Sequence, residues 1–142
     1  METPVFNTDL EHLLLDPDDR RLYLSSNRTG YVSSIDLDRL LSALMSAHGG
    51  KIELDGWLER EVGKWARTIA LTPDRQLLLV TVFGDSELVA LDAETLTILA
   101  RITVDSFPVG LAISPDGKRV WTTSQGRNLQ GGNSISIFDL QY

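Results

Sequence analysis

Two short signals recur three times along the chain, in the same order and at a nearly fixed separation. The first is a proline followed directly by aspartate, and the second is an aspartate that follows an apolar residue. The anchors form the pairs Pro17 and Asp36, Pro73 and Asp92, and Pro115 and Asp139. Their separation is 19 residues in the first two pairs and 24 in the third, where the extra residues fall most simply within 127–132. The chain is therefore expected to contain three copies of one structural unit.

The second copy shows what one unit contains. Its strand-like segments are apolar and rich in β-branched residues, and turn residues separate them. They cover 67–71, 77–82, 87–92 and 97–104. Proline followed by aspartate favours a tight turn, because proline fixes φ and the aspartate side chain bonds nearby backbone N–H groups. From Pro73 to Pro115 the period is 42 residues, which is typical of a four-stranded propeller blade. We expect an all-β fold, a partial β-propeller of about three four-stranded antiparallel blades.

The first unit is longer than the second because an insertion follows Asp36. Its period is 56 residues. Apolar residues in the insertion fall at i, i+3, i+4, i+7 and i+8, the stripe of an amphipathic helix; they are Leu37, Leu40, Leu41, Leu44 and Met45. We expect one inserted helix over 37–48, capped by Asp36 or Asp38, that either packs on the rim of the blade or docks a partner. An outer strand within 51–62 should follow, with Trp57 as an apolar anchor.

The three units divide the chain, a single propeller segment over 1–142, into blades. We expect blade 1 over about 9–63, blade 2 over 65–106, and blade 3 over 107–142 with its last strand missing. Propellers close with about four to eight blades, so three cannot form a ring. Two interpretations stay open. The chain is a fragment of a larger propeller, or identical chains self-associate to complete a ring, the segment 3–7 of one chain supplying the missing strand of the next.

Charge and composition exclude several classes of function. Thirteen basic against twenty acidic residues give a net charge of −7, which argues against a nucleic-acid partner, because phosphate binding needs clustered Lys and Arg. No cysteine is present, so disulfides and thiolate nucleophiles are excluded. Acidic residues gather at turns, but their spacing matches no calcium loop, and we expect neither a metal nor a cofactor. Apolar runs are shorter than the roughly eighteen residues that a membrane span needs.

The beginning of the sequence bears on localisation. It shows no basic segment followed by an apolar one, so no secretory leader is visible. As written, the chain is expected in the cytoplasm. If it belongs to an exported propeller, an extracytoplasmic location is expected instead.

Candidate site residues follow from the repeat. Glu11, Arg67 and Val109 occupy one repeat position, and Trp65 and Phe107 lie two positions before it. Inner strands of a propeller line its channel, so charged and aromatic side chains here would form a ligand site at the channel mouth. The candidates are Glu11, His12, Trp65, Arg67 and Phe107. A second interpretation stays open, in which Arg67 pairs with Glu11 or a neighbouring carboxylate, the aromatic rings fill gaps between blades, and His12 is an edge or turn residue.

The third unit carries a resemblance to a known family. Ser-Pro-Asp-Gly-Lys-Arg-Val-Trp-Thr-Thr-Ser at 114–124 and Asn-Ser-Ile-Ser-Ile-Phe-Asp at 133–139 resemble the YVTN-type β-propeller repeat of lactonase-like and surface-layer proteins. The resemblance covers about 10–140, with 37–60 outside it. Propellers host many activities, so we expect a non-catalytic binding or scaffold module that presents its loops and channel mouth to a protein or small ligand. The resemblance implies one alternative, a lactonase-like hydrolase of a sugar lactone. A structural fragment of a larger propeller is another.

Overall fold

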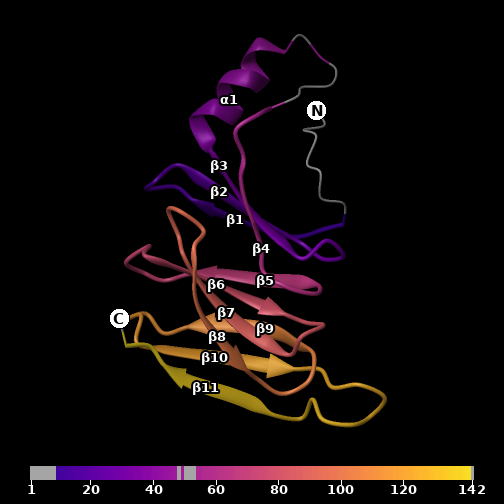
Figure 1. Cartoon of the computed structure of the whole chain (residues 1–142). Helices are drawn as coiled ribbons and strands as arrows, with labels where there is room; N and C mark the ends of the chain where they lie inside the picture. The colour runs from indigo at the N-terminus through magenta and orange to yellow at the C-terminus, as the bar shows by residue number, and fades with distance from the viewer. Residues whose placement is uncertain (1–8, 48, 50–53, 142) are drawn as a thin grey trace.

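A computed structural model describes residues 9–47, 49 and 54–141. The described chain forms three antiparallel sheets that follow one another along the sequence and lie one above the next (Figure 1). The expected donor segment 3–7 and His48, the last residue of the expected helix, lie outside the described residues.

Each sheet is a simple meander in which neighbouring strands in sequence are hydrogen-bonded neighbours in space. Sheet 1 contains β1 (Leu10–Asp16), β2 (Arg21–Ser26), β3 (Tyr31–Asp36) and β4 (Leu58–Glu61). Sheet 2 contains β5 (Ala66–Leu71), β6 (Leu77–Val82), β7 (Glu87–Asp92) and β8 (Ile98–Thr103). Sheet 3 contains β9 (Pro108–Ile113), β10 (Arg119–Ser124) and β11 (Ile135–Asp139). The expected all-β fold with three repeated units is confirmed.

The core lies between the sheets and explains the continuous apolar run of β6. Successive side chains of a strand point to opposite faces of its sheet. Leu78 and Val80 pack with Tyr23 of sheet 1, whereas Leu77 and Leu79 belong to the cluster around Val120 of sheet 3. Every residue of β6 is buried, because sheet 2 is covered on both faces.

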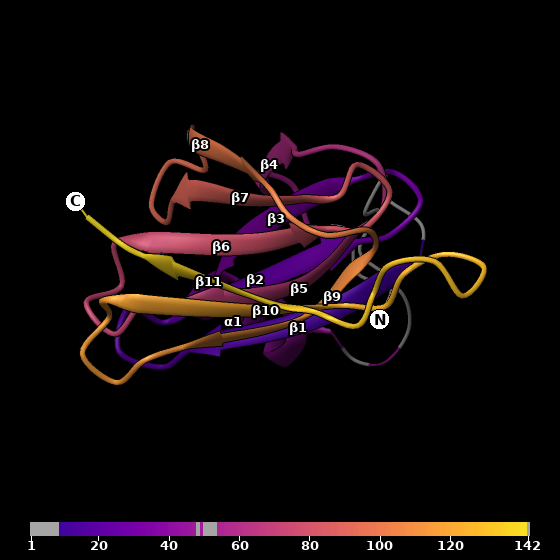
Figure 2. The ribbon, with the colours of Figure 1, turned by 90° about the horizontal axis from the view of Figure 1, so that it is seen from below.

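The first strands of the three sheets lie together. β1 contacts β5, and β5 contacts β9. The fourth strands β4 and β8 lie on one side of the molecule, at the top of Figure 2. Each sheet therefore runs outward from a shared inner edge, which is the arrangement of propeller blades.

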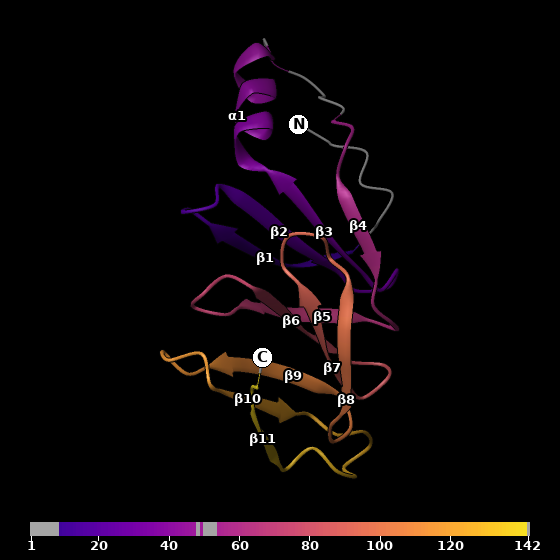
Figure 3. The same cartoon turned by 60° about the vertical axis from the view of Figure 1, so that its left-hand side comes forward.

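The insertion forms α1 (Leu37–Ser46), which ends before the expected boundary at 48. Asp36 is its N-cap, and its carboxylate accepts a hydrogen bond from Arg39 N at 2.9 Å. No residue of α1 is buried, and Met45 is 84% exposed. The helix extends away from sheet 1 at the end of the stack (Figures 1 and 3). The expected packing of its apolar stripe on the blade is therefore wrong for the described residues.

Two ion pairs link α1 to neighbouring segments of unit 1. Arg20 pairs with Asp38 at 2.7 Å, and Arg39 pairs with Asp55 at 2.9 Å. The outer strand β4 lies within the expected 51–62 and begins directly after the partly buried Trp57, whereas residues 51–53 lie outside the described residues. Within the described part of the chain, α1 is the single helix, and it is too short to cross a membrane.

Candidate functional site

The first strand of each sheet begins after a residue with left-handed backbone. Asp9, Trp65 and Phe107 have φ of 61°, 63° and 56°, and the three occupy the same repeat position. Side chains other than glycine, asparagine and aspartate rarely adopt this conformation, because Cβ crowds the following carbonyl. Since all three units share it, the strained conformation is part of the repeat. It places the aromatic residues of units 2 and 3 at the same end of the sheets.

Aromatic rings and guanidinium groups form a continuous row at this end, which we call the aromatic row: Trp65, Arg67, Phe83, Phe107 and Arg127. The rings of Phe83 and Phe107 are stacked, with centroids 4.4 Å apart and planes at 7°. The ring centroids of Trp65 and Phe83 lie 6.0 Å apart, and Trp65 as a residue is 44% exposed. Cζ of Arg67 lies 4.6 Å from the Phe83 centroid, and Cζ of Arg127 lies 5.8 Å from the Phe107 centroid. Such contacts stabilise both the rings and the cations.

A carboxylate of sheet 1 meets the row at Arg67. Arg67 Nε lies 3.3 Å from Glu11 Oε1, and Asn27 Nδ2 donates to Glu11 Oε2 at 3.0 Å. The interpretation in which Arg67 pairs with Glu11 is therefore confirmed. Both oxygens of Glu11 have protein partners, so its carboxylate is engaged in joining sheet 1 to sheet 2.

His12 has a comparable linking role. Its Nδ1 accepts a hydrogen bond from Ile69 N in sheet 2 at 3.0 Å. At the same repeat position in sheet 2, Thr68 Oγ1 donates to Val109 O of sheet 3 at 2.6 Å. Ser25 Oγ also donates across the boundary, to Arg67 O. The structure thus brings Glu11, Trp65, Arg67 and Phe107 to one face, and it uses His12 between the sheets.

Sequence analysis missed two members of the row. Phe83 follows β6 at the repeat position that Asn27 occupies after β2, so aligning the units around the ends of the second strands would have found it. Arg127 lies in the extra residues of unit 3. No repeat equivalent exists there, and only the folded loop shows that Arg127 reaches Phe107.

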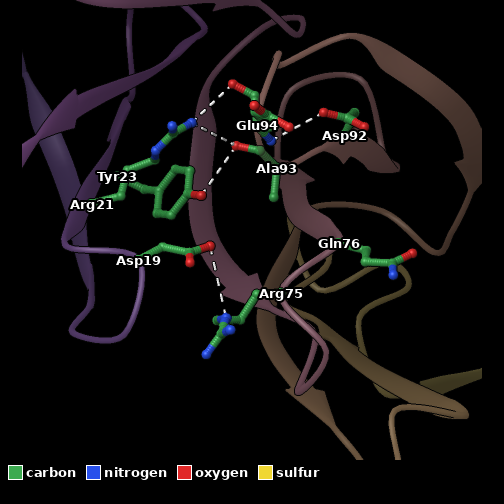
Figure 4. A pocket seen from close by; sticks show the side chains of 8 residues that line it. All are labelled: Asp19, Arg21, Tyr23, Arg75, Gln76, Asp92, Ala93 and Glu94. Carbon is green, nitrogen blue, oxygen red and sulfur yellow. Dashed lines mark hydrogen bonds and ion pairs between the residues drawn. The ribbon is translucent and has the colours of Figure 1, made fainter.

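A polar cavity of about 570 Å³ lies at the opposite end of the sheets (Figure 4). It is lined by Asp19, Arg21, Tyr23, Arg75, Gln76, Asp92, Ala93 and Glu94. Arg21 donates to Glu94 O at 2.9 Å, and the Tyr23 hydroxyl donates to Ala93 O at 3.1 Å. Arg75 lies 3.7 Å from Asp19. These contacts connect sheet 1 to sheet 2, and burial raises the pKa of Tyr23.

The carboxylate of Asp92, which lines this cavity, already has hydrogen-bond partners in the protein. Asp92 accepts hydrogen bonds from Thr95 N, Thr95 Oγ1 and Glu94 N, which lower the pKa of its carboxyl and engage it within its own turn. Among the described residues, no group of three or more His, Cys, Asp or Glu side chains is placed to hold a metal ion.

Comparisons with known proteins show the fold. No family model matches the chain, and no curated protein matches it. Hydrazine synthase of Kuenenia stuttgartiensis superposes with a TM-score of 0.71 at 24% identity, over 98% of this chain and 36% of that one. A candidate 6-phosphogluconolactonase of Bacteroides uniformis gives 0.69 at 15% identity, over 93% and 37%. Dihydro-heme d1 dehydrogenase NirN gives 0.60 at 19%, over 93% and 28%.

The fold is a partial β-propeller. At these identities the likeness concerns the fold alone, and the more specific YVTN-type assignment stays a prediction. The chain covers only 28% to 37% of the lengths of these three structures. The activities of such longer proteins therefore do not transfer to it directly.

Proposed function

We propose that this propeller segment is a non-catalytic binding module that presents the aromatic row to a protein partner. The observation that carries the proposal is the exposed Trp65 beside the stacked Phe83 and Phe107, with Arg67 and Arg127 over the rings. Trp, Phe and Arg are enriched in the buried centres of protein interfaces, and Trp and Arg dominate their binding energy. Rigid rings also lose little conformational entropy on binding.

The site favours binding over the lactonase-like alternative. A hydrolase needs a free acid or base within reach of its substrate. At this face the carboxylate of Glu11 holds Arg67 and Asn27, and the imidazole of His12 holds Ile69 N. Turnover of a sugar lactone by the purified chain, lost in Arg67→Ala, would favour the hydrolase instead.

The test is a selection from a phage-displayed dodecapeptide library on the immobilised chain, followed by titration of the selected peptides. Trp65→Gly is the decisive variant, because glycine adopts a positive φ without strain and only the indole is lost. We expect peptide affinity to fall by about tenfold or more, and the peptides to raise the melting temperature of the wild type. Leu99→Thr, on the exposed strand β8, is the matched surface control. Peptides that bind Trp65→Gly as tightly as wild type contradict the proposal.

We also propose that a second copy completes the ring, so that two chains supply six blades. Sheets 1 and 3 end the described stack, and each exposes apolar strand residues: Leu13 at 58% and Leu15 at 50% in β1, and Ile135 at 64% and Ile137 at 58% in β11. Among the described residues, β11 pairs only with β10, whereas β3 and β7 each hold a further strand. Such edges and faces favour association.

Light scattering over a dilution series tests the second copy. A dimer of twice 15.7 kDa that dissociates in Ile137→Lys is the expected result. A monomeric wild type contradicts ring completion by a second copy and favours the fragment interpretation. Light scattering reports the mass of the assembly and peptide titration reports affinity at the aromatic row, so the two proposals are tested by separate measurements.

A further inference from the structure

The loop between β10 and β11 protrudes from the body of the sheets (Figure 2). Arg127 and Gln130 exchange backbone hydrogen bonds of 2.9 and 2.8 Å, and the two residues between them, Asn128 and Leu129, have φ of 50° and 63°. Two consecutive left-handed residues make a tight hairpin turn, for which Asn-Gly is the favoured sequence. We call residues 127–130 the loop tip.

Leu129 is an unfavourable choice for the turn itself. It occupies the position where glycine is preferred, and the residue is fully exposed, at 106% of its reference area. Positive φ costs a leucine backbone energy that glycine avoids, and the exposed isobutyl group gains nothing from burial in this chain. Strained, exposed residues of this kind occur at functional sites, where the side chain is used.

Among the residues that the structure describes, Arg127, at the base of the same tip, is the one arginine without a carboxylate or carbonyl partner. The sequence contains ten arginines. Nine of them contact a carboxylate or a backbone carbonyl: Arg20, Arg21, Arg28, Arg39, Arg60, Arg67, Arg75, Arg101 and Arg119. Arg127 has no such contact among the described residues, and it lies over the ring of Phe107 instead. Its five N–H donors are therefore available to a carboxylate.

The loop is fixed at its base. Asp105 accepts from Ser134 Oγ at 2.5 Å and from Gly132 N at 3.0 Å through Oδ2, and from Ser106 N at 2.6 Å through Oδ1. Gly126 N donates to Ser106 O at 3.0 Å. These bonds hold both sides of the loop to the segment before β9. A held loop loses less conformational freedom when it binds.

We propose that the loop tip is the docking element of this module, for a protein segment that offers an apolar socket to Leu129 and a carboxylate to Arg127. This rests on the proposed function, since Phe107 joins the loop tip to the aromatic row. The chain as a whole carries −7 and repels an acidic partner. Arg127 therefore selects where such a partner can approach, and like charges elsewhere disfavour other orientations.

The test uses the dodecapeptides selected on the wild-type chain and two tip variants. In Leu129→Gly we expect affinity to fall by about tenfold or more, while the melting temperature stays equal or rises because glycine suits the turn. In Arg127→Gln we expect weaker binding with a reduced dependence on salt concentration, because one ionic contact is lost. The matched controls are Leu99→Thr and Arg119→Gln, which should bind as wild type.

The outcomes distinguish the loop-tip proposal from the binding-module proposal. The selected peptides should pair an acidic with an apolar residue. If Leu129→Gly binds like wild type while Trp65→Gly does not, the loop-tip proposal is overturned and the binding module stands. If neither variant loses affinity, or the library yields no peptide, both proposals fail. A clear fall in the melting temperature of Leu129→Gly would show that Leu129 supports the fold, and would also overturn the loop-tip proposal.

Discussion

The imidazole of His12 in β1 accepts a hydrogen bond from the backbone N–H of Ile69 in β5, with 3.0 Å between Nδ1 and N. These two strands belong to different sheets and are not paired in a ladder, so their facing backbone groups need other partners. Thr68 and Ser25 serve the same purpose, with Val109 O and Arg67 O as acceptors. Side chains of the first and second strands thus connect neighbouring sheets where no strand pairing does.

Removing the imidazole of His12, the acceptor for Ile69 N, should destabilise the protein. Ile69 is buried at 2% exposure, so His12→Ala leaves its N–H without a partner. We expect a loss of about 1–3 kcal/mol in the free energy of unfolding, measured by urea titration. His12→Asn places an amide oxygen at a similar reach and should recover part of the loss. Equal stability of His12→Ala and wild type would show that water replaces the imidazole.

The contacts of Arg67 should be separable by double-mutant cycles. We expect a coupling of about 0.5–1 kcal/mol between Arg67 and Phe83, because the cation lies over the ring at a partly exposed site. The pair of Arg67 with Glu11 should contribute about 0.2–1 kcal/mol and weaken as salt is added. Unfolding of the single and double alanine variants at low and high salt measures both. A salt-independent Glu11 coupling would contradict the ionic interpretation.

Tyr23 should make stability sensitive to alkaline pH. Its buried hydroxyl donates to Ala93 O, and burial raises its pKa above 10.0. The folded state keeps this proton to a higher pH than the unfolded state does. The contribution of the Tyr23 hydroxyl to the free energy of unfolding is therefore complete below pH about 10 and is lost as the pH rises further. Tyr23→Phe should cost about 1 kcal/mol at neutral pH and flatten the alkaline decline. An identical decline in the variant would assign it to other groups.

Asp105 should make stability sensitive to acid. Hydrogen bonds from Ser134, Ser106 and Gly132 lower the pKa of its carboxyl below 3.8. A lowered folded-state pKa stabilises the protein at higher pH, and the contribution is lost as pH falls below about 4. Asp105→Asn should therefore be less stable than wild type at pH 7, with the difference shrinking as the wild-type carboxyl is protonated. Urea titrations at neutral and acid pH measure this, and a constant difference would contradict the assignment.

Much of the fold could be predicted because its signals are local. Pro73 with Asp74, and Asp92 after Leu91, mark turns that depend on few neighbouring residues, and their repeat in three units indicates one architecture. The apolar period of the insertion similarly predicts α1. The environment of that helix was predicted wrongly, because its apolar stripe indicates burial whereas no described residue of α1 is buried.

The candidate site was predicted only in part. Repeat positions placed Glu11, Trp65, Arg67 and Phe107 on one face, since equivalent residues of stacked units lie at equivalent heights. Arg127, in the extra residues of unit 3, has no equivalent, and nothing local distinguishes it from a solvated surface residue.

The sequence by itself determined the strands, their turns and their repetition, because backbone conformation and hydrophobic period are properties of short segments. The tertiary structure alone decided that His12 bonds to Ile69, that Phe83 stacks on Phe107, and that Arg127 has no carboxylate partner among the described residues. Those relationships join side chains from different sheets, and only the packing of one sheet against the next fixes the distances between them.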